Sequence, residues 1–210
     1  MHNAPVHDEY LCMECKINLP TTDFHLFEEN IFTNRLWGRF PLQSGTAQLL
    51  MIKGGLAENI IYNIKYRNAT QLAINLGEKY GRKLVKAPLY KDVDVIVPVP
   101  IHASKMRTRG YNQSAMFGSG LSESMNIPLV ENVLIKKRKT KSQTKKSRLN
   151  RLLSVQNEYV IKKPERLIGK HILLVDDVLT TGATIESCAL ELLKVEGVRL
   201  SLATIAFKAQ

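Results

Sequence analysis

Short apolar runs alternate with longer segments of helical periodicity along most of the chain. A strand buried on both faces is predicted at 172–175, where apolar, largely β-branched residues follow one another without interruption. Mostly apolar runs predict a further buried strand at 93–99 and a last strand at 200–207. Less regular apolar runs predict strands at 46–52 and 129–135. Helices are predicted at 56–66, 71–84, 114–125 and 185–193, where apolar residues recur at spacings of three and four. This alternation predicts an α/β domain with a mainly parallel twisted sheet flanked by helices.

The composition is that of a globular protein, but its positive charge is concentrated in one segment. The 210 residues are 44% hydrophobic and 23% charged, enough for one buried core and a small appendage. Of the 30 basic residues, nine lie in the segment 136–151, which contains no acid, and the remaining 21 nearly balance 19 acidic residues. Such a segment suits a polyanionic substrate or a nucleic-acid backbone.

No part of the chain predicts membrane association. No apolar run approaches the length of a membrane span, and residues 1–10 have neither the basic nor the apolar region of a signal peptide. We therefore expect a cytoplasmic protein, in agreement with the sparse use of cysteine.

Two of the three cysteines form a C-x-x-C pair near the start of the chain. Cys12 and Cys15 have the spacing of half a zinc ribbon, whereas a closed structural zinc site needs four ligands. His7 and His25 are candidates to complete it, and the alternative is a pair of thiols that binds nothing. Cys188 falls on the apolar face of the last predicted helix, where a buried thiol is expected.

The most informative segment is the strand at 172–175 with the residues that follow it. Two carboxylates, Asp176 and Asp177, are expected to end the strand, and a small hydroxyl-rich turn at 180–184 leads into a helix. A helix N-terminus offers unpaired amides and a positive dipole end, and Gly182 lets the backbone approach an anion closely. This pattern favours a phosphate at the turn, with the carboxylates facing hydroxyls or a magnesium ion of the same ligand. A P-loop is excluded because no G-x-x-x-x-G-K-[ST] occurs.

A second candidate anion site follows the strand at 93–99. Pro98 and Pro100 end that strand, and Lys105, Arg107 and Arg109 then lie in a predicted loop before the next helix. Arginine forks suit bidentate phosphate contacts. The alternative is a solvated basic turn.

The residues V-D-D-V at 175–178 with T-T-G-A-T at 180–184 resemble the phosphoribosyl pyrophosphate (PRPP) motif of type I phosphoribosyltransferases. The resemblance implies that fold, with the acidic pair on the ribose 2′ and 3′ hydroxyls and the turn around the 5′-phosphate. The implied PRPP-binding residues are Val175, Asp176, Asp177, Val178, Thr180, Thr181, Gly182, Ala183 and Thr184. The catalytic residues implied are Asp176, Asp177, Arg107 and Arg109.

A narrower resemblance, to the ComF family, covers most of the chain. It rests on the C-x-x-C pair, on W-G-R at 37–39, K-G-G at 53–55 and I-K-Y at 64–66, and on P-V-P at 98–100 followed by R-G-Y-N-Q at 109–113. The pyrophosphate loop it implies comprises Pro100, His102, Lys105, Arg107, Arg109 and Gly110. The implied flexible loop contains Arg138, Lys139, Thr140, Gln143 and Arg151. The family usually has two C-x-x-C pairs, so either a zinc ribbon here is degenerate or a true start lies upstream.

The resemblance divides the chain into an N-terminal appendage at 1–45 and a phosphoribosyltransferase-like domain at 46–210. It implies an enzyme that binds PRPP with Mg²⁺ and transfers the phosphoribosyl group to an unidentified acceptor, releasing pyrophosphate. The alternative is a non-catalytic accessory protein of DNA uptake, a partner of competence machinery that binds single-stranded DNA or a nucleotide through the basic segment. No general base is evident, and the oligomeric state is open, with a homodimer as one alternative.

Overall fold

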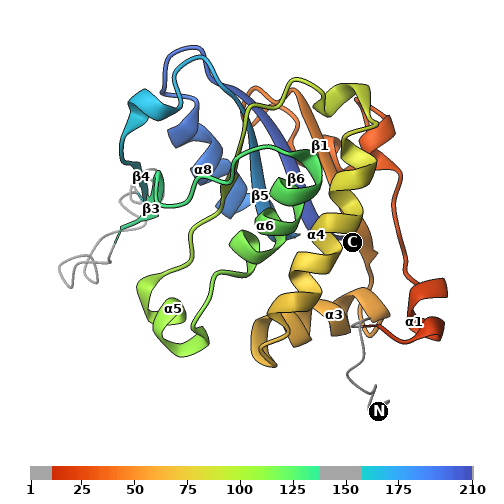
Figure 1. Cartoon of the computed structure of the whole chain (residues 1–210). Helices are drawn as coiled ribbons and strands as arrows, with labels where there is room; N and C mark the ends of the chain where they lie inside the picture. Colours follow the sequence, from red (N-terminus) through yellow and green to blue (C-terminus); the bar gives the residue numbers. More distant parts are fainter. Residues whose placement is uncertain (1–10, 138–157, 210) are drawn as a thin grey trace.

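A parallel four-stranded sheet forms the centre of the computed structural model, which describes residues 11–137 and 158–209 (Figure 1). Its strands, in the spatial order β1-β6-β5-β2, are β1 (Ser44–Met51), β6 (Arg199–Lys208), β5 (His171–Leu179) and β2 (Val95–Pro98). Each neighbouring pair in this sheet is parallel. A separate antiparallel pair consists of β3 (Leu134–Lys136) and β4 (Tyr159–Ile161). The sheet confirms the predicted parallel α/β architecture.

Helices cover both faces of the sheet. One buried cluster joins it to α3 (Leu56–Tyr66), α4 (Thr70–Leu84) and α6 (Gln113–Met125), and the other joins it to α2 (Ile31–Leu36) and α8 (Ala183–Leu192). The shorter helices are α1 (Met13–Ile17), α5 (Ala103–Arg109), η1 (Phe24–Leu26), η2 (Pro88–Tyr90) and η4 (Pro164–Arg166). None of the described helices is long and apolar enough to cross a membrane.

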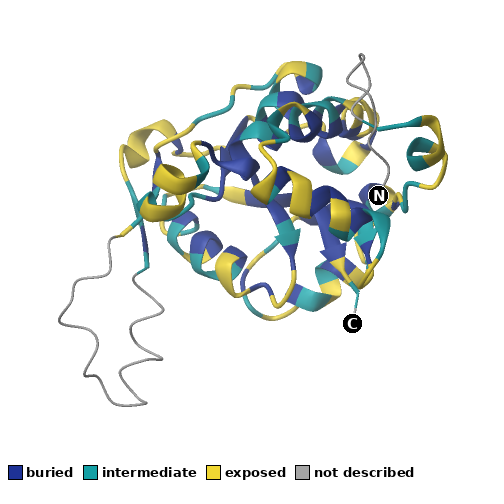
Figure 2. Ribbon diagram, turned by 90° about the horizontal axis from the view of Figure 1, so that it is seen from below, coloured by how far each residue is buried: buried dark blue, intermediate teal, exposed yellow. Residues whose placement is uncertain are grey.

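The central strand β5 is apolar on both sides because both of its faces are covered. Leu173 and Val175 join the cluster beneath α4 and α6, whereas Ile172 and Leu174 join the cluster beneath α8. Buried residues accordingly gather along the strands, and exposed residues on the outer faces of the helices (Figure 2). The unbroken apolar run that predicted this strand thus reflects burial from two directions.

Glycines allow α4 and α6 to pack in close contact. A Cβ atom on Gly120 of α6 would lie 2.0 Å from the carbonyl oxygen of Ile74, and one on Gly77 of α4 would lie 2.2 Å from that of Phe117. No side chain can occupy either position unless the helices move apart. Gly77 and Gly120 therefore serve helix packing.

The N-terminal segment shares the core of the sheet. The amide of Thr22 donates to the carbonyl of Gln48 at 2.9 Å, and a single bridge pairs Thr21 with Leu49. Phe32 and Leu36 of α2 are fully buried in the cluster that contains α8. The division into 1–45 and 46–210 stays a prediction, but residues on both sides of that boundary pack together.

Two predicted elements differ from the structure. The predicted loop after Pro100 contains a short helix, α5, because the side chain of His102 caps its N-terminus and Gly110 ends it in the left-handed conformation at φ 83°. Within 129–135, only residues from Leu134 onward belong to a strand, and Leu129 makes an isolated bridge to Ile96. Asn132 interrupts the run at φ 63°, a conformation incompatible with a continuous strand.

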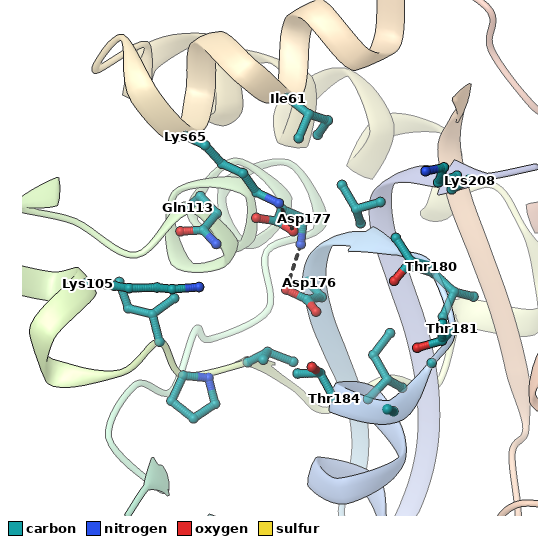
Figure 3. A pocket seen from close by; sticks show the side chains of 18 of the residues that line it. Ile61, Lys65, Lys105, Gln113, Asp176, Asp177, Thr180, Thr181, Thr184 and Lys208 are labelled. Carbon is teal, nitrogen blue, oxygen red and sulfur yellow. Dashed lines mark hydrogen bonds and ion pairs between the residues drawn. The ribbon is translucent and has the colours of Figure 1, made fainter. Parts of the chain in front are cut away.

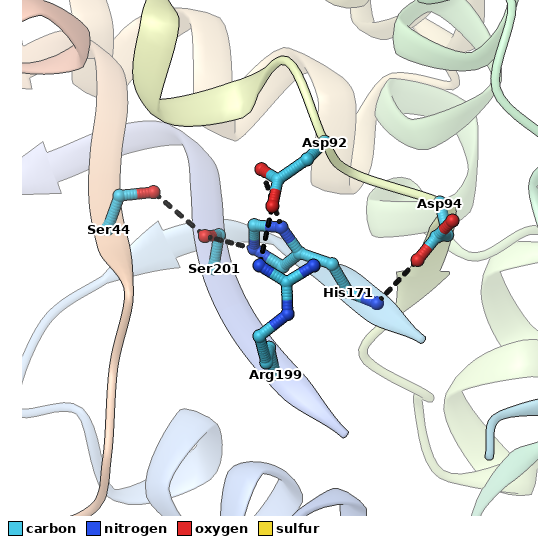
Figure 4. Close-up of polar contacts among 6 residues, drawn as sticks. All are labelled: Ser44, Asp92, Asp94, His171, Arg199 and Ser201. Carbon is cyan, nitrogen blue, oxygen red and sulfur yellow. Dashed lines mark hydrogen bonds and ion pairs between the residues drawn. The ribbon is translucent and has the colours of Figure 1, made fainter. Parts of the chain in front are cut away.

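A polar network ties together the amino ends of the strands (Figure 4). His171, which is buried at the start of β5, lies 3.1 Å from Asp92 through Nδ1 and 2.8 Å from the Ser201 hydroxyl through Nε2. Ser44 of β1 donates to Ser201 at 2.8 Å, and Arg199 pairs with Asp92. The network fastens three strands at the edge opposite the pocket described next.

Candidate functional site

The carboxyl ends of the strands surround a pocket of about 490 Å³ (Figure 3). Its lining includes Met51 at the end of β1, Lys208 at the end of β6, the end of β5 with the turn that follows, and residues after β2. This is the position at which open α/β sheets bind ligands.

The acidic pair lies within β5, not at its end as predicted. Pairing with β2 stops at Pro98, opposite Val175, whereas pairing with β6 continues to Leu179. The strand persists because β6 still supplies hydrogen-bond partners after β2 has turned away. Asp176 and Asp177 therefore lie just past the point where β2 leaves the sheet.

Both carboxylates are buried, yet both line the pocket. Asp176 is 8% exposed and accepts hydrogen bonds at 2.8 Å from the Ser114 hydroxyl and from the Asp177 amide, both on Oδ1. Lys65 Nζ lies 3.1 Å from Oδ1 of Asp177, while Oδ2 of Asp177 is buried without a hydrogen-bond partner in the described structure. A buried acceptor of this kind is costly unless a ligand donates to it.

The surroundings of Asp176 change its ionisation. Burial, together with the neighbouring charge of Asp177, raises the pKa of Asp176 to about 7. The hydrogen bond from Ser114 and the charge of Lys65 act in the opposite direction and favour the ionised form. Near neutral pH the carboxyl group of Asp176 is therefore only partly ionised, and the neighbouring groups set the ionised fraction.

The turn after β5 presents backbone amides at the N-terminus of α8. Gly182 adopts φ 85° as the N-cap of this helix, and no side chain caps the first turn. A Cβ atom on Gly182 would also lie 2.6 Å from Leu36. Only glycine fits this backbone and leaves the helix N-terminus open to an anion.

Two arginines from the N-terminal segment hold the turn from outside. Arg35 donates to the carbonyl of Thr180 at 2.7 Å, and Arg39 donates to that of Thr181, also at 2.7 Å. Because the C=O and N–H of a trans peptide point in opposite directions, the following amides, at Thr181 and Gly182, are directed away from the arginines. The N-terminal segment is therefore in contact with the turn.

The cation side of the pocket is formed by α5 and its flanks. Pro100, His102, Lys105 and Arg109 line the pocket. Arg109 bonds to the amide oxygen of Gln113 and lies 5.6 Å from the centre of the Tyr66 ring. The three cations predicted in a loop thus lie on helix α5. The helix places Lys105 and Arg109 about one turn apart.

The pocket brings together most, but not all, of the predicted site residues. From the PRPP motif it collects Asp176, Asp177, Val178, Thr180, Thr181, Gly182, Ala183 and Thr184. Among the described residues, Val175 lies instead in the core, and Arg107 and Gly110 are exposed outside the lining. The predicted flexible-loop residues Arg138, Lys139, Thr140, Gln143 and Arg151 fall outside the described residues.

Several residues of the site were missed by sequence reasoning. Lys65 reaches Asp177 from α3, and Ser114 reaches Asp176 from the start of α6. Asn112 positions Ser114, since it accepts from the Ser114 amide at 3.1 Å and donates to the carbonyl of Val99 at 3.0 Å. The sequence signal that could have identified them is a polar residue at the end of a predicted helix. Lys65 directly follows the last apolar residue of its helix, and the polar residues N-Q-S at 112–114 stand where the next helix is predicted to begin.

The zinc prediction rests on the cysteine pair alone. The Cys15 amide lies 3.5 Å from Cys12 Sγ, and this bond lowers the pKa of the Cys12 thiol. His25 is buried against Tyr80, with ring centres 5.7 Å apart, and His7 lies outside the described ranges. Residues 11–137 and 158–209 contain no group of three or more potential metal ligands, so bound zinc stays a prediction. Cys188 is fully buried as expected.

Comparisons with known proteins agree with this architecture. Residues 112–210 match the family described as Phosphoribosyl transferase domain. DNA utilization protein YhgH of Escherichia coli is 26% identical over 193 residues, which cover 89% of this chain and 79% of YhgH. Together with the parallel sheet, these findings confirm the predicted phosphoribosyltransferase fold.

Two competence proteins match a shorter part of the chain. Competence protein ComFC of Bacillus subtilis is 33% identical over 96 residues, which cover 45% of this chain and 36% of ComFC. Competence protein F of Haemophilus influenzae is 30% identical over 93 residues, covering 44% of this chain and 41% of that protein. The matched part therefore spans less than half the length of either competence protein. These identities confirm the resemblance to the ComF family.

Proposed function

We propose that this protein is a phosphoribosyltransferase that binds PRPP with Mg²⁺ in the pocket and transfers the phosphoribosyl group to an acceptor, with release of pyrophosphate. The observation that carries the proposal is that the acidic pair, Asp176 and Asp177, lines a pocket that also holds an open helix N-terminus and a cationic helix. A sugar with vicinal hydroxyls and phosphates at both ends complements all three.

The ribose would lie over the acidic pair. Ionised carboxylates accept strong hydrogen bonds from hydroxyl groups, so the carboxylates of Asp176 and Asp177, which line the pocket, suit the 2′ and 3′ hydroxyls. When the bond to pyrophosphate breaks, positive charge develops on the sugar ring. Two buried carboxylates held in place by Ser114 and Lys65 would stabilise that charge without reorganisation.

The phosphates would occupy the two flanks. The amides at Thr181 and Gly182 and the first turn of α8 suit the 5′-phosphate, which a helix N-terminus stabilises. Lys105 and Arg109 of α5 suit the pyrophosphate and the negative charge that it gains on departure.

The site also fits magnesium that arrives with the substrate. Mg²⁺ is commonly held by one or two carboxylates together with substrate phosphates and water, which agrees with two carboxylates, Asp176 and Asp177, in the lining of the pocket. Bound magnesium would neutralise part of the pyrophosphate charge.

Calorimetric titration with PRPP and magnesium tests the proposal. The parent protein should bind, and Asp177→Asn should weaken binding roughly tenfold to a hundredfold, because a hydrogen bond to a charged group contributes about 1.5–3 kcal/mol. Glu78→Gln is the matched control, since Glu78 forms an exposed ion pair with Arg82 on α4. If the parent shows no affinity for PRPP, the proposal is wrong. If the parent binds PRPP, a screen of nucleobases, amines and ammonia for pyrophosphate release identifies the acceptor.

The relatives' names favour a second candidate function, a role in the use of DNA taken up by the cell. Two matched proteins are named for competence and one for DNA utilization. In that case the basic segment 136–151 would bind the phosphates of single-stranded DNA without reading bases. Neutralising its lysines and arginines should then remove a steeply salt-dependent DNA affinity that Asp176→Asn with Asp177→Asn leaves nearly intact. DNA affinity that is unaffected by neutralisation would exclude this function of the segment.

A further inference from the structure

A second hollow adjoins the pocket, between α3 and α5. Its volume is about 470 Å³, and its lining includes Tyr66 of α3, Lys105, Thr108 and Arg109 of α5, and Tyr111. The two helices lie side by side along the lower edge of the molecule (Figure 1). We call this hollow the α3–α5 groove.

The groove is positively charged. Its eight lining residues include three cations, Lys65, Lys105 and Arg109, and no acid. Lys65 is paired with Asp177, but no described residue forms an ion pair with Lys105 or Arg109. Two unneutralised cations on one wall suit a phosphate group.

The opposite wall presents an aromatic surface. Tyr66 in this wall is 66% exposed. Tyr62, one turn earlier, is 51% exposed and lines the adjoining pocket rather than the groove. Their ring centres lie 5.1 Å apart with a tilt of 46°, so the two rings form one continuous exposed surface. Large aromatic side chains at the rim of a basic hollow provide a stacking surface for planar bases.

The groove is held together by contacts across it. The hydroxyl of Tyr111 donates to the carbonyl of Ile64, which fastens the last turn of α3 to the segment after α5. The guanidinium of Arg109 lies 5.6 Å from the centre of the Tyr66 ring, a cation–π contact that orients both side chains. A ligand would thus meet an ordered aromatic ring and an ordered cation.

We propose that the α3–α5 groove binds a nucleotide unit, with its base stacked on the exposed tyrosines and its phosphate beside Lys105 and Arg109. The proposal goes beyond the transfer reaction and does not depend on it, because this binding needs neither PRPP nor the acidic pair. Since Lys65, Tyr66, Lys105 and Arg109 line both hollows, a nucleotide in the groove would lie directly beside a ligand in the pocket.

Fluorescence anisotropy and calorimetry without PRPP test the groove with two probes, thymidine monophosphate and a labelled single-stranded thymidine oligonucleotide. Tyr66→Leu should weaken binding roughly tenfold, because stacking of one base is lost. Tyr66→Phe keeps the ring and should bind within about twofold of the parent. Asp177→Asn should not weaken nucleotide binding. Because Tyr66 is exposed at a helix end, the variants should fold, which circular dichroism verifies.

The two probes distinguish the source of the nucleotide. Tyr66-dependent binding of the monophosphate identifies a free nucleotide as a sufficient ligand, whereas Tyr66-dependent binding of the oligonucleotide alone identifies a single strand. Either result supports the groove. Absence of binding by both probes, or equal affinity of the parent and Tyr66→Leu, overturns it. A parent that binds nucleotide but not PRPP would contradict the proposed function and leave the groove standing.

Discussion

Arg39 donates a hydrogen bond of 2.7 Å to the carbonyl oxygen of Thr181, which lies 142 positions later in the chain. The same guanidinium lies 3.4 Å from the carboxylate of Glu186 on α8. Arg35 makes the equivalent bond to Thr180, so the N-terminal segment grips the backbone of the turn that would receive the 5′-phosphate. The contact couples the N-terminal segment to the site, although neither arginine lines the pocket.

Replacing Arg39 should weaken PRPP binding moderately. Arg39→Gln removes the bond that orients the Thr181 peptide, and the loss of one such bond amounts to about 1 kcal/mol, or roughly fivefold in affinity. Calorimetry at constant magnesium measures the change. Arg82→Gln is the control, because Arg82 is exposed on α4 away from the turn. Equal affinities of Arg39→Gln and Arg82→Gln would show that the arginine does not position the turn.

The raised pKa of Asp176 predicts a stability that falls as the pH rises. The native carboxyl has a pKa of about 7, whereas an unfolded aspartate ionises near about 3.9, so between these values the native state binds more protons than the unfolded state. The contribution of this group is therefore most favourable below about pH 4, declines up to about pH 7 and is constant above.

Asp176→Asn tests that linkage, since asparagine keeps an acceptor for the Ser114 hydroxyl. The variant should be more stable than the parent at pH 8 by up to about 4 kcal/mol, and the difference should shrink towards pH 4. Urea denaturation at several pH values gives both free energies of unfolding. A difference in the free energy of unfolding that does not change with pH would mean that the pKa of Asp176 is the same in the native and unfolded states. The gain in stability should be accompanied by weaker PRPP binding.

Gly120→Ala should destabilise the protein. In most exposed helices this change is stabilising by up to about 1 kcal/mol, but here the new Cβ would lie 2.0 Å from the carbonyl oxygen of Ile74. Overpacking of this kind costs about 1–3 kcal/mol. Urea denaturation measures the effect, with Ser119→Ala in the same helix as the reference. A variant at least as stable as the reference would show that α4 and α6 can separate without cost.

His171→Phe should reduce stability and spare the site. The ring keeps its volume but loses its contacts with Asp92 and Ser201, at a cost of about 1–3 kcal/mol. PRPP affinity should stay within about twofold of the parent, because the network lies at the opposite edge of the sheet. Thermal melting and calorimetry on the same samples separate the two effects. A large loss of affinity would instead reveal coupling between the two edges.

The sequence by itself determined the strand, the acidic pair and the glycine turn of the central segment. The strand at 172–175 was predicted because an unbroken apolar run is typical of burial on two faces, and both faces are covered. Gly182 was predicted as the place where the backbone approaches an anion closely, and its φ of 85° is a conformation that favours glycine. Both features depend on residues that are adjacent in the sequence, so the sequence pattern alone can predict them.

Only the tertiary structure decided how far β5 runs and which side chains meet the acidic pair. Asp176 and Asp177 lie inside the strand because β6 extends beyond β2, and nothing within residues 171–179 records the length of its neighbours. Lys65, Ser114, Arg35 and Arg39 reach the site from distant parts of the chain, since contacts between remote segments depend on packing and not on spacing along the sequence.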